Sequence, residues 1–231
     1  MKRNIINTVF CIMIISGCTA KQKETPVNTQ APKPYLTPEK RAIIKRYTDS
    51  LSRILMHGNS SRTGANAFLQ EKAIMHNILE LDSIDYTANF LMAQVHAKGK
   101  NYDSSIYYLT RVINFNPNLT RYYDFRGALW LIKSDKAKAD ADFKKIIAIL
   151  ETKMRSTTLR DEVRLADIGL IAIANVMLGK FTTQNSLDYY NDEVKKLHLS
   201  PNLEKTVRAN RAGLASFNKK AYIETNARGF L

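Results

Sequence analysis

The chain has 231 residues, of which 45% are hydrophobic, and it contains only nine glycines and six prolines. This size and apolar content suffice for one sizeable folded domain, whereas the scarcity of turn-forming residues argues against a many-turned β architecture. The formal net charge is +14 at pH 7, so the compartment of this basic protein has to be established before its charge indicates a partner.

A short basic and then apolar segment opens the chain. Lys2 and Arg3 precede an apolar run over residues 5–15, which is shorter than the roughly 20 residues of a membrane-spanning helix. It therefore predicts an export signal. The run ends in Ile15-Ser16-Gly17-Cys18, which resembles the lipobox of bacterial lipoproteins. The resemblance implies a signal peptide over residues 1–17 and acylation of Cys18. The alternative is a plain secretory signal with a coincidental cysteine.

Cysteine usage agrees with lipidation. The two cysteines are Cys11, inside the signal, and Cys18, so no thiol remains for a disulfide, a metal or catalysis. Residues 18–36 contain three prolines and few aliphatic residues, which predicts a flexible tether behind the lipidated cysteine. The anchor places the protein in the bacterial cell envelope. Thr19, in place of an aspartate, follows Cys18; by the same resemblance this implies the outer membrane, with the domain facing the periplasm or the cell surface.

The folded domain is predicted to span residues 37–231 and to begin with a pair of helices. Thr37 suits an N-cap, Pro38 the first turn, and Glu39 the helix dipole. This helix should end at Gly58, and a second should run from about Ala65 to Leu81. The apolar stripes expected to face inward are Ile43, Ile44, Tyr47, Leu51, Ile54 and Leu55 in the first helix, and Phe68, Ile74, Ile78 and Leu81 in the second.

Residues 86–150 repeat themselves at a shift of 34 residues. This period, with small residues at two fixed slots, indicates a helix–turn–helix repeat, against the alternative of a helical hairpin with chance periodicity. The shift pairs Ala93 with Gly127, Ser105 with Ala139, Leu109 with Phe143, and Val112 with Ile146.

The segment Arg126-Gly127, followed by Ala139, Asp142-Phe143 and Ile146-Ile147, resembles the tetratricopeptide repeat (TPR) family. The resemblance implies an all-α fold, namely a TPR-like solenoid of antiparallel helix pairs. We expect about three repeats and a C-terminal capping helix, with the best repeats in residues 86–150.

The register is lost after residue 150. A polar insertion is expected from Thr152 to Glu162, followed by a helix buried on several faces from Val163 to Leu178, which is too short and polar to span a membrane. Gly179 should turn the chain into a partner helix from Ser186 to Leu199. One final helix is then predicted from about Asn202 to Lys220.

No constellation of residues predicts catalysis or a cofactor. The four histidines are scattered without metal-ligand spacing, and neither a glycine-rich phosphate loop nor a nucleophile elbow is present. The sequence therefore predicts that the protein is not an enzyme and holds no metal. The histidines are His57, His76, His96 and His198.

The inner groove of TPR proteins is lined by the first helix of each pair, so the resemblance implies where a partner would bind. The lysine/asparagine clamp by which some family members bind a peptide carboxylate is absent, because Phe90, Gln94, Asp124 and Ala128 stand at those positions. Tyr122, Tyr123 and Trp130 either grip a peptide or pack between helices. The implied groove residues are Thr87, Phe90, Gln94 and Ala97 in one repeat, and Arg121, Asp124, Ala128 and Leu131 in the next.

The basic surplus is concentrated late in the chain. Residues 195–231 contain eight Lys or Arg against two Glu. A basic face is expected on the final helix, formed by Lys205, Arg208, Arg211 and Lys219. It would contact an acidic protein, an anionic envelope surface or only solvent. Nucleic acid, the partner that a high pI first suggests, ranks below these because an exported protein rarely meets it.

Together these features predict an envelope lipoprotein whose repeat domain is an adaptor or scaffold for an unidentified envelope protein or peptide. The alternative is a polysaccharide- or peptidoglycan-associated factor that binds through the basic final helix. The first hypothesis predicts that the folded domain binds one protein in stoichiometric amount. The alternative predicts that it binds only cell-wall material.

Overall fold

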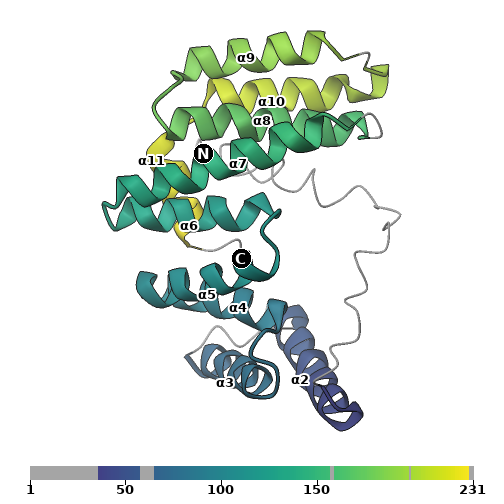
Figure 1. Cartoon of the computed structure of the whole chain (residues 1–231), viewed down its shortest axis with the longest axis vertical. Coiled ribbons are helices and arrows are strands. Elements are labelled where there is room, and N and C mark those ends of the chain that lie inside the picture. The colour runs from purple at the N-terminus through teal and green to yellow at the C-terminus, as the bar shows by residue number, and fades with distance from the viewer. Residues whose placement is uncertain (1–35, 58–64, 157–158, 198, 229–231) are drawn as a thin grey trace. The chain divides into compact units, whose positions relative to one another are not determined.

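The computed structural model describes residues 36–57, 65–156, 159–197 and 199–228 (Figure 1). Every regular element in these residues is a helix and no strand occurs among them, so the prediction of an all-α fold is confirmed. The signal peptide, Cys18 and nearly all of the tether lie outside the described residues. The elements are α2 (Pro38–His57), α3 (Ala65–Leu81), α4 (Tyr86–Lys98), α5 (Tyr102–Phe115), α6 (Thr120–Ile132), α7 (Lys136–Met154), α8 (Asp161–Met177), α9 (Thr183–Lys195), the 3₁₀ turn η1 (Pro201–Leu203), α10 (Glu204–Ala215) and α11 (Lys219–Ala227).

The helices form two compact units. We call residues 36–129 with 225–228 the amino-terminal unit, and residues 130–224 the carboxy-terminal unit. The boundaries fall within α6 and α11, so each of these helices contributes residues to both units. None of the described helices is long and apolar enough to cross a membrane.

The amino-terminal unit begins as the sequence predicts. The hydroxyl of Thr37 accepts a hydrogen bond from the backbone N–H of Lys40 at 3.3 Å, which caps α2. Ile43, expected to face inward, is exposed, and the side chains of Ile54, Leu55 and Phe68 lie outside the described residues. The core of α2, α3 and α4 is built from Leu51, Met75, Ile78, Ala88, Met92 and Val95.

Helices α4 and α5 cross closely at the small residues of the repeat. The Ser105 hydroxyl donates a hydrogen bond of 2.7 Å to the backbone carbonyl of Ala93, and both residues have 0% exposure. A larger side chain at either position would hold the helices apart, because a close-packed interior does not accept added volume without strain. The residues that set the 34-residue period in the sequence therefore set the helix spacing here.

The turns between paired helices have the same backbone conformation. Lys100, after α4, has φ = 58°, and Ser134, 34 residues later and after α6, has φ = 61°. In each case the next residue caps the following helix: Asn101 accepts from the N–H of Ser104, and Asp135 from that of Lys138, both at 3.2 Å. Gly179, after α8, has φ = 76°, as its predicted role in a turn requires.

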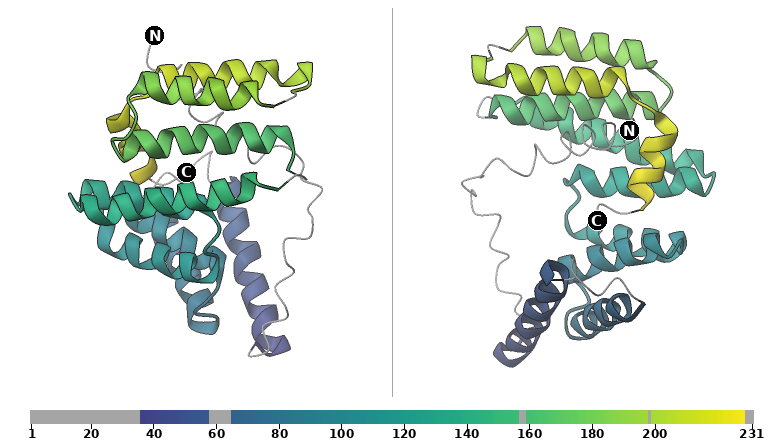
Figure 2. Two further views of the ribbon diagram at one scale, coloured as in Figure 1. Left: turned by 45° about the horizontal axis from the view of Figure 1, so that its top comes forward. Right: turned by 180° about the vertical axis from the view of Figure 1, so that it is seen from behind.

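In the carboxy-terminal unit, α8 is the most deeply buried helix. Helices α8, α9 and α10 lie side by side, and α10 contacts both of the others (Figures 1 and 2). The prediction of a helix buried on several faces is confirmed. The polar insertion expected from Thr152 is shorter than predicted, because α7 continues to Met154.

A buried hydrogen bond joins α9 to α10. The amide nitrogen of Asn210 donates to the hydroxyl of Tyr190 at 2.9 Å, and both side chains are buried. Burial raises the pKa of Tyr190, and this effect is opposed by the hydrogen bond from Asn210. The phenol is therefore neutral at physiological pH and fixes the spacing of the two helices.

The single final helix predicted from Asn202 to Lys220 is wrong. The chain forms η1 and α10, leaves the helix at Ser216–Asn218, and continues as α11. Two contacts favour the break. The rings of Phe217 and Tyr222 pack with centroids 5.3 Å apart, and the Asn218 side chain accepts from the N–H of Ala221 at 2.9 Å, which caps α11.

The partner helix also differs from its predicted bounds, since α9 runs from Thr183 to Lys195 rather than from Ser186 to Leu199. Its start is set by a capping box in which Thr182 and Asn185 exchange side chain-to-backbone hydrogen bonds of 3.1 and 3.3 Å. The box uses an asparagine where glutamate or glutamine is usual, which weakens its sequence signal.

Candidate functional site

The implied TPR groove is only partly accessible. Gln94, Ala97, Asp124 and Ala128 are buried. Thr87 and Arg121 are exposed, whereas Phe90 and Leu131 are half-buried. A partner would therefore meet chiefly the exposed and half-buried residues.

Arg121 is already engaged within the amino-terminal unit. Its guanidinium lies over the rings of Phe90 and Tyr122, 5.3 and 4.7 Å from their centroids. It also donates to the hydroxyls of Tyr86 and Tyr122, while the ring of Phe90 meets that of Tyr122 edge-on at 5.0 Å. These contacts join α4 to α6, so Tyr122 packs between helices.

The other two candidate aromatics also have partners. The hydroxyl of Tyr123, which is buried, donates to the carbonyl of Pro117 at 3.1 Å. The ring of Trp130 is covered by the ammonium of Lys138, 4.4 Å from its centroid. Tyr122 and Tyr123 are therefore packing residues rather than residues exposed to a peptide, and Trp130 is half-buried beneath Lys138.

One of the implied groove residues, Asp124, is bound by Asn226 of α11. The amide of Asn226 donates a hydrogen bond of 3.2 Å to the carboxylate of Asp124, and both side chains are buried in the amino-terminal unit. Asp124 is thus bound by the chain itself. No local sequence pattern indicates this contact, which joins residues 102 positions apart.

The basic face is smaller than predicted. Lys205, Arg208 and Arg211 are exposed on α10. Lys219 lies on α11, where its ammonium donates to the carbonyl of Met177 at 2.9 Å, at the C-terminal end of α8. There it satisfies a carbonyl that has no intrahelical partner. Lys219 is therefore not a fourth member of one helical face.

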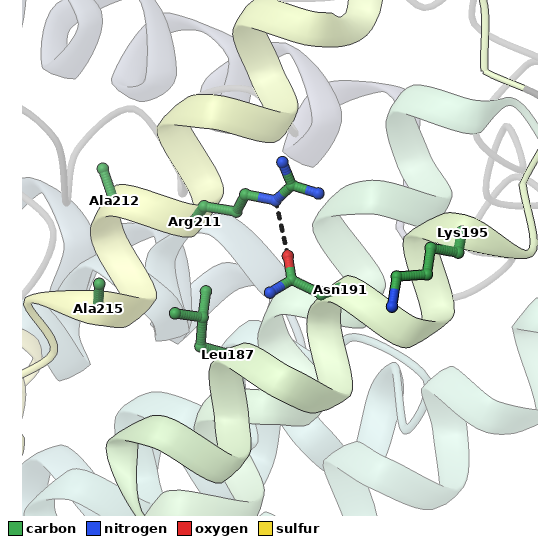
Figure 3. A pocket seen from close by; sticks show the side chains of 6 residues that line it. All are labelled: Leu187, Asn191, Lys195, Arg211, Ala212 and Ala215. Carbon is green, nitrogen blue, oxygen red and sulfur yellow. Dashed lines mark hydrogen bonds between the residues drawn. The ribbon is translucent and has the colours of Figure 1, made fainter.

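Arg211 lies in a groove between α9 and α10 that the sequence analysis did not predict (Figure 3). Its guanidinium reaches across the groove, where Nε donates to the side-chain oxygen of Asn191 at 2.6 Å. One hollow of about 520 Å³ has Arg211 on its edge; it is lined by Leu187, Asn191, Lys195, Arg211, Ala212 and Ala215.

A second hollow of about 450 Å³ lies where α9, α10 and the connection between them meet, and it shares Arg211 with the first. Its apolar lining includes Val194 and Val207, while Arg208 and Glu204 supply charge. We call the two hollows together the α9–α10 groove. The second is lined by Val194, Leu199, Ser200, Pro201, Glu204, Val207, Arg208 and Arg211.

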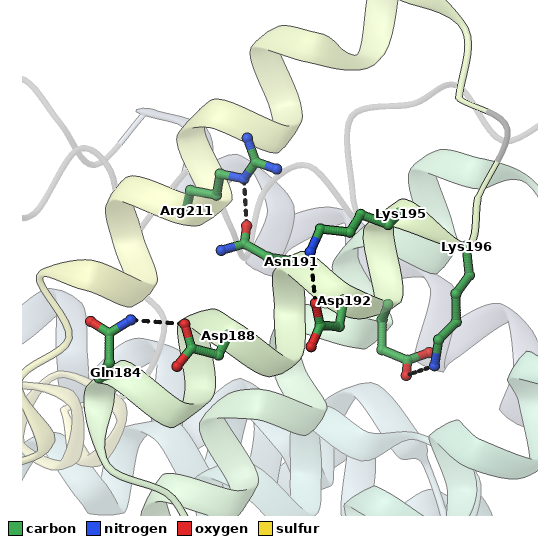
Figure 4. Close-up of polar contacts among 8 residues, drawn as sticks. Gln184, Asp188, Asn191, Asp192, Lys195, Lys196 and Arg211 are labelled. Atoms are coloured by element: carbon green, nitrogen blue, oxygen red, sulfur yellow. Dashed lines mark hydrogen bonds and ion pairs between the residues drawn. The ribbon is translucent and has the colours of Figure 1, made fainter.

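Beside this groove, the exposed face of α9 carries its own charge partners (Figure 4). Lys195 binds Asp192 at 2.9 Å and Lys196 binds Glu193 at 2.5 Å, each pair three residues apart. The hydrogen bond from Lys195 and its charge lower the pKa of Asp192. The charges of Lys195 and Lys196 are therefore largely balanced by neighbouring carboxylates, unlike that of Arg208 on α10.

The histidines that the structure describes do not cluster. His76 lies 3.3 Å from Glu80 on one exposed helical turn, and His96 stacks on Tyr108 with ring centroids 5.5 Å apart. Burial, followed by the charge of Lys72, lowers the pKa of His96. The side chains of His57 and His198 lie outside the described residues. Within those residues, no group of three His, Cys, Asp or Glu side chains is placed to hold a metal ion.

The chain matches no model of a known protein family and no curated protein sequence. The α9–α10 groove is not predicted by the sequence analysis, because its two helices are 20 residues apart in the chain. In addition, the sequence analysis places α10 within one longer final helix. The spacing of Leu187, Asn191 and Val194, at i, i+4 and i+7, was the signal available.

Proposed function

We propose that the protein is a lipid-anchored lipoprotein of the bacterial envelope whose helices form a TPR-like solenoid and serve as an adaptor for another protein. The observation that carries the proposal is the recurrence of one turn, with φ near 60° and a capping side chain, at Lys100–Asn101 and 34 residues later at Ser134–Asp135. A repeated turn at the period of the sequence repeat is expected of stacked helix pairs.

Two further contacts support this arrangement. Helix α4 meets not only α5 but also α6, through the rings of Phe90 and Tyr122, and α10 meets both α9 and α8. Contact between the first helices of successive pairs is what a solenoid needs in order to bury the face that one pair leaves open. Such scaffolds present extended surfaces to partners, which favours binding over catalysis.

The adaptor function is tested by recovering the partner of the full chain. We expect an affinity-tagged full-length chain, cross-linked in its own cells and extracted with detergent, to recover one protein in stoichiometric amount. An unrelated lipoprotein with the same tag is the control. Retention only on cell-wall material would contradict the adaptor and favour the polysaccharide- or peptidoglycan-associated alternative.

Lipidation is tested separately through Cys18, which lies outside the described residues. Cys18→Ala should leave the precursor unacylated and uncleaved, because the thiol is the acylation site that the lipobox resemblance implies. The measurement is metabolic labelling with a fatty acid, together with the apparent mass of the chain. Cys11→Ala is the matched control and should be processed normally. Normal acylation of Cys18→Ala would refute the anchor.

A further inference from the structure

The lining of the α9–α10 groove combines apolar and basic side chains. Leu187, Ala212 and Ala215 line one hollow, and Val194 and Val207 line the other. The charged lining consists of Lys195, Arg208 and Arg211 against Glu204, a net charge of +2. An apolar side chain flanked by carboxylates is the complementary ligand, since it would bury apolar surface and satisfy the cations.

The two arginines have donor groups to spare. Among the described residues, Arg208 makes no side-chain hydrogen bond or ion pair, and Arg211 uses only its Nε, toward Asn191. The terminal nitrogens of both guanidinium groups are therefore available, and their fork geometry suits a carboxylate. Lys195 is partly neutralised by Asp192, so most of the attraction would come from α10.

We propose that the α9–α10 groove binds an acidic amphipathic peptide segment of a partner protein. Apolar side chains of the segment enter the two hollows, and its carboxylates bind Arg208 and Arg211. This inference rests on the proposed adaptor function and deepens it by naming the surface and the chemistry of the partner.

Other polyanions fit the groove less well. A bilayer surface is flat and does not enter a hollow between helices, and the lining contains none of the Trp or Tyr side chains that favour the membrane interface. Single-stranded nucleic acid is bound by stacking its bases on aromatic side chains, which this lining also lacks. A peptide supplies both the apolar side chains and the carboxylates.

The test selects ligands from a displayed library of random 16-residue peptides on the full-length chain in detergent. We expect the enriched peptides to be acidic and to carry Leu, Ile or Phe. Their affinities, measured by fluorescence anisotropy, should fall roughly tenfold or more in the Arg208→Glu/Arg211→Glu variant, which replaces attraction by repulsion. Ala212→Tyr, which fills the first hollow without changing charge, should also weaken binding.

The matched control is Lys144→Glu/Lys145→Glu. It makes the same change in net charge on exposed residues of α7, and it should leave the affinity near that of the wild type. Equal loss in the control, or enrichment of neutral or basic peptides, would overturn the proposed groove. So would stronger binding to phosphatidylglycerol vesicles than to any peptide, with the vesicle binding lost in the Arg208→Glu/Arg211→Glu variant. If a stoichiometric partner is recovered and its binding does not change in these variants, the proposed adaptor function is retained and only the α9–α10 groove is rejected as its binding surface.

Discussion

Replacing Phe143 with alanine is expected to lower the free energy of unfolding by about 3–5 kcal/mol. The ring lies on α7 with 0% exposure, so truncation removes its buried apolar surface and leaves a cavity that the surrounding close-packed side chains fill only in part. Urea denaturation followed by circular dichroism measures the effect. It should appear as a lower midpoint with an unchanged slope.

Lys144→Ala is the control for Phe143→Ala. The two positions are adjacent in α7, but Lys144 is exposed, and substitution of an exposed residue away from specific contacts changes stability little. A loss in Phe143→Ala as small as in the control would mean that the ring does not lie in the core.

Replacing Lys153 with methionine is expected to lower the free energy of unfolding by about 2 kcal/mol at pH 7, because it removes the cation from a buried carboxylate. The ammonium of Lys153 donates to one oxygen of Asp167 at 3.1 Å and lies 2.8 Å from the other, joining α7 to α8. The Asp167 side chain is 10% exposed and that of Lys153 is 42% exposed. Water therefore reaches the lysine, and the cost stays below that of a fully buried pair.

The pH dependence of the stability loss in Lys153→Met tests whether the buried charge of Asp167 causes that loss. Burial raises the pKa of Asp167, and the hydrogen bond and charge of Lys153 oppose that rise. A carboxyl group whose pKa is raised by folding stabilises the folded state fully at pH values below its pKa in the unfolded chain, about 3.9. This contribution is lost as the pH rises through its pKa in the folded state. Without Lys153 the folded pKa rises further. The deficit of the variant should therefore shrink as the pH falls from 7 toward 4.

Two comparisons complete the Lys153 experiment. Lys153→Met/Asp167→Asn should regain most of the lost stability, because no charge is then left buried. Lys195→Met removes the cation from the exposed Asp192 pair, where burial imposes no such penalty, so it should change stability little between pH 4 and 7. A Lys153→Met deficit that stays constant across this range would show that packing, and not the Asp167 charge, is responsible.

The sequence was a good guide where helix limits depend on strong local signals. Thr37 and Pro38 placed the start of α2, the approximate bounds predicted for α3 agree with the structure, and Gly179 marked its turn. The break between α10 and α11 was missed because its causes are an asparagine cap at Asn218 and a ring contact between Phe217 and Tyr222. Neither is distinctive in a run of otherwise helical residues.

The candidate sites were harder to predict because access depends on distant packing. Gln94, Asp124 and Ala128 occupy the groove slots that the family resemblance implies, yet they are buried. In the case of Asp124, a residue 102 positions away contributes to the burial. Arg208 and Arg211 were identified as basic residues, but the hollow beside them requires α9, whose relation to α10 is fixed by Tyr190 and Asn210. Periodicity within one helix carries no information on that contact.

The ion pairs beside the α9–α10 groove make its two helices unequal in exposed positive charge. Lys195, the last residue of α9, and Lys196, the residue after it, each pair with a carboxylate of that helix, so their fields largely cancel a short distance into the solvent. Lys205 and Arg208 on α10 have no such partner among the described residues. The electrostatic potential is therefore stronger over α10, and an approaching anionic partner is steered to that helix within the roughly 8 Å over which physiological salt leaves charges unscreened. Rising ionic strength would slow such encounters before it loosened the bound complex.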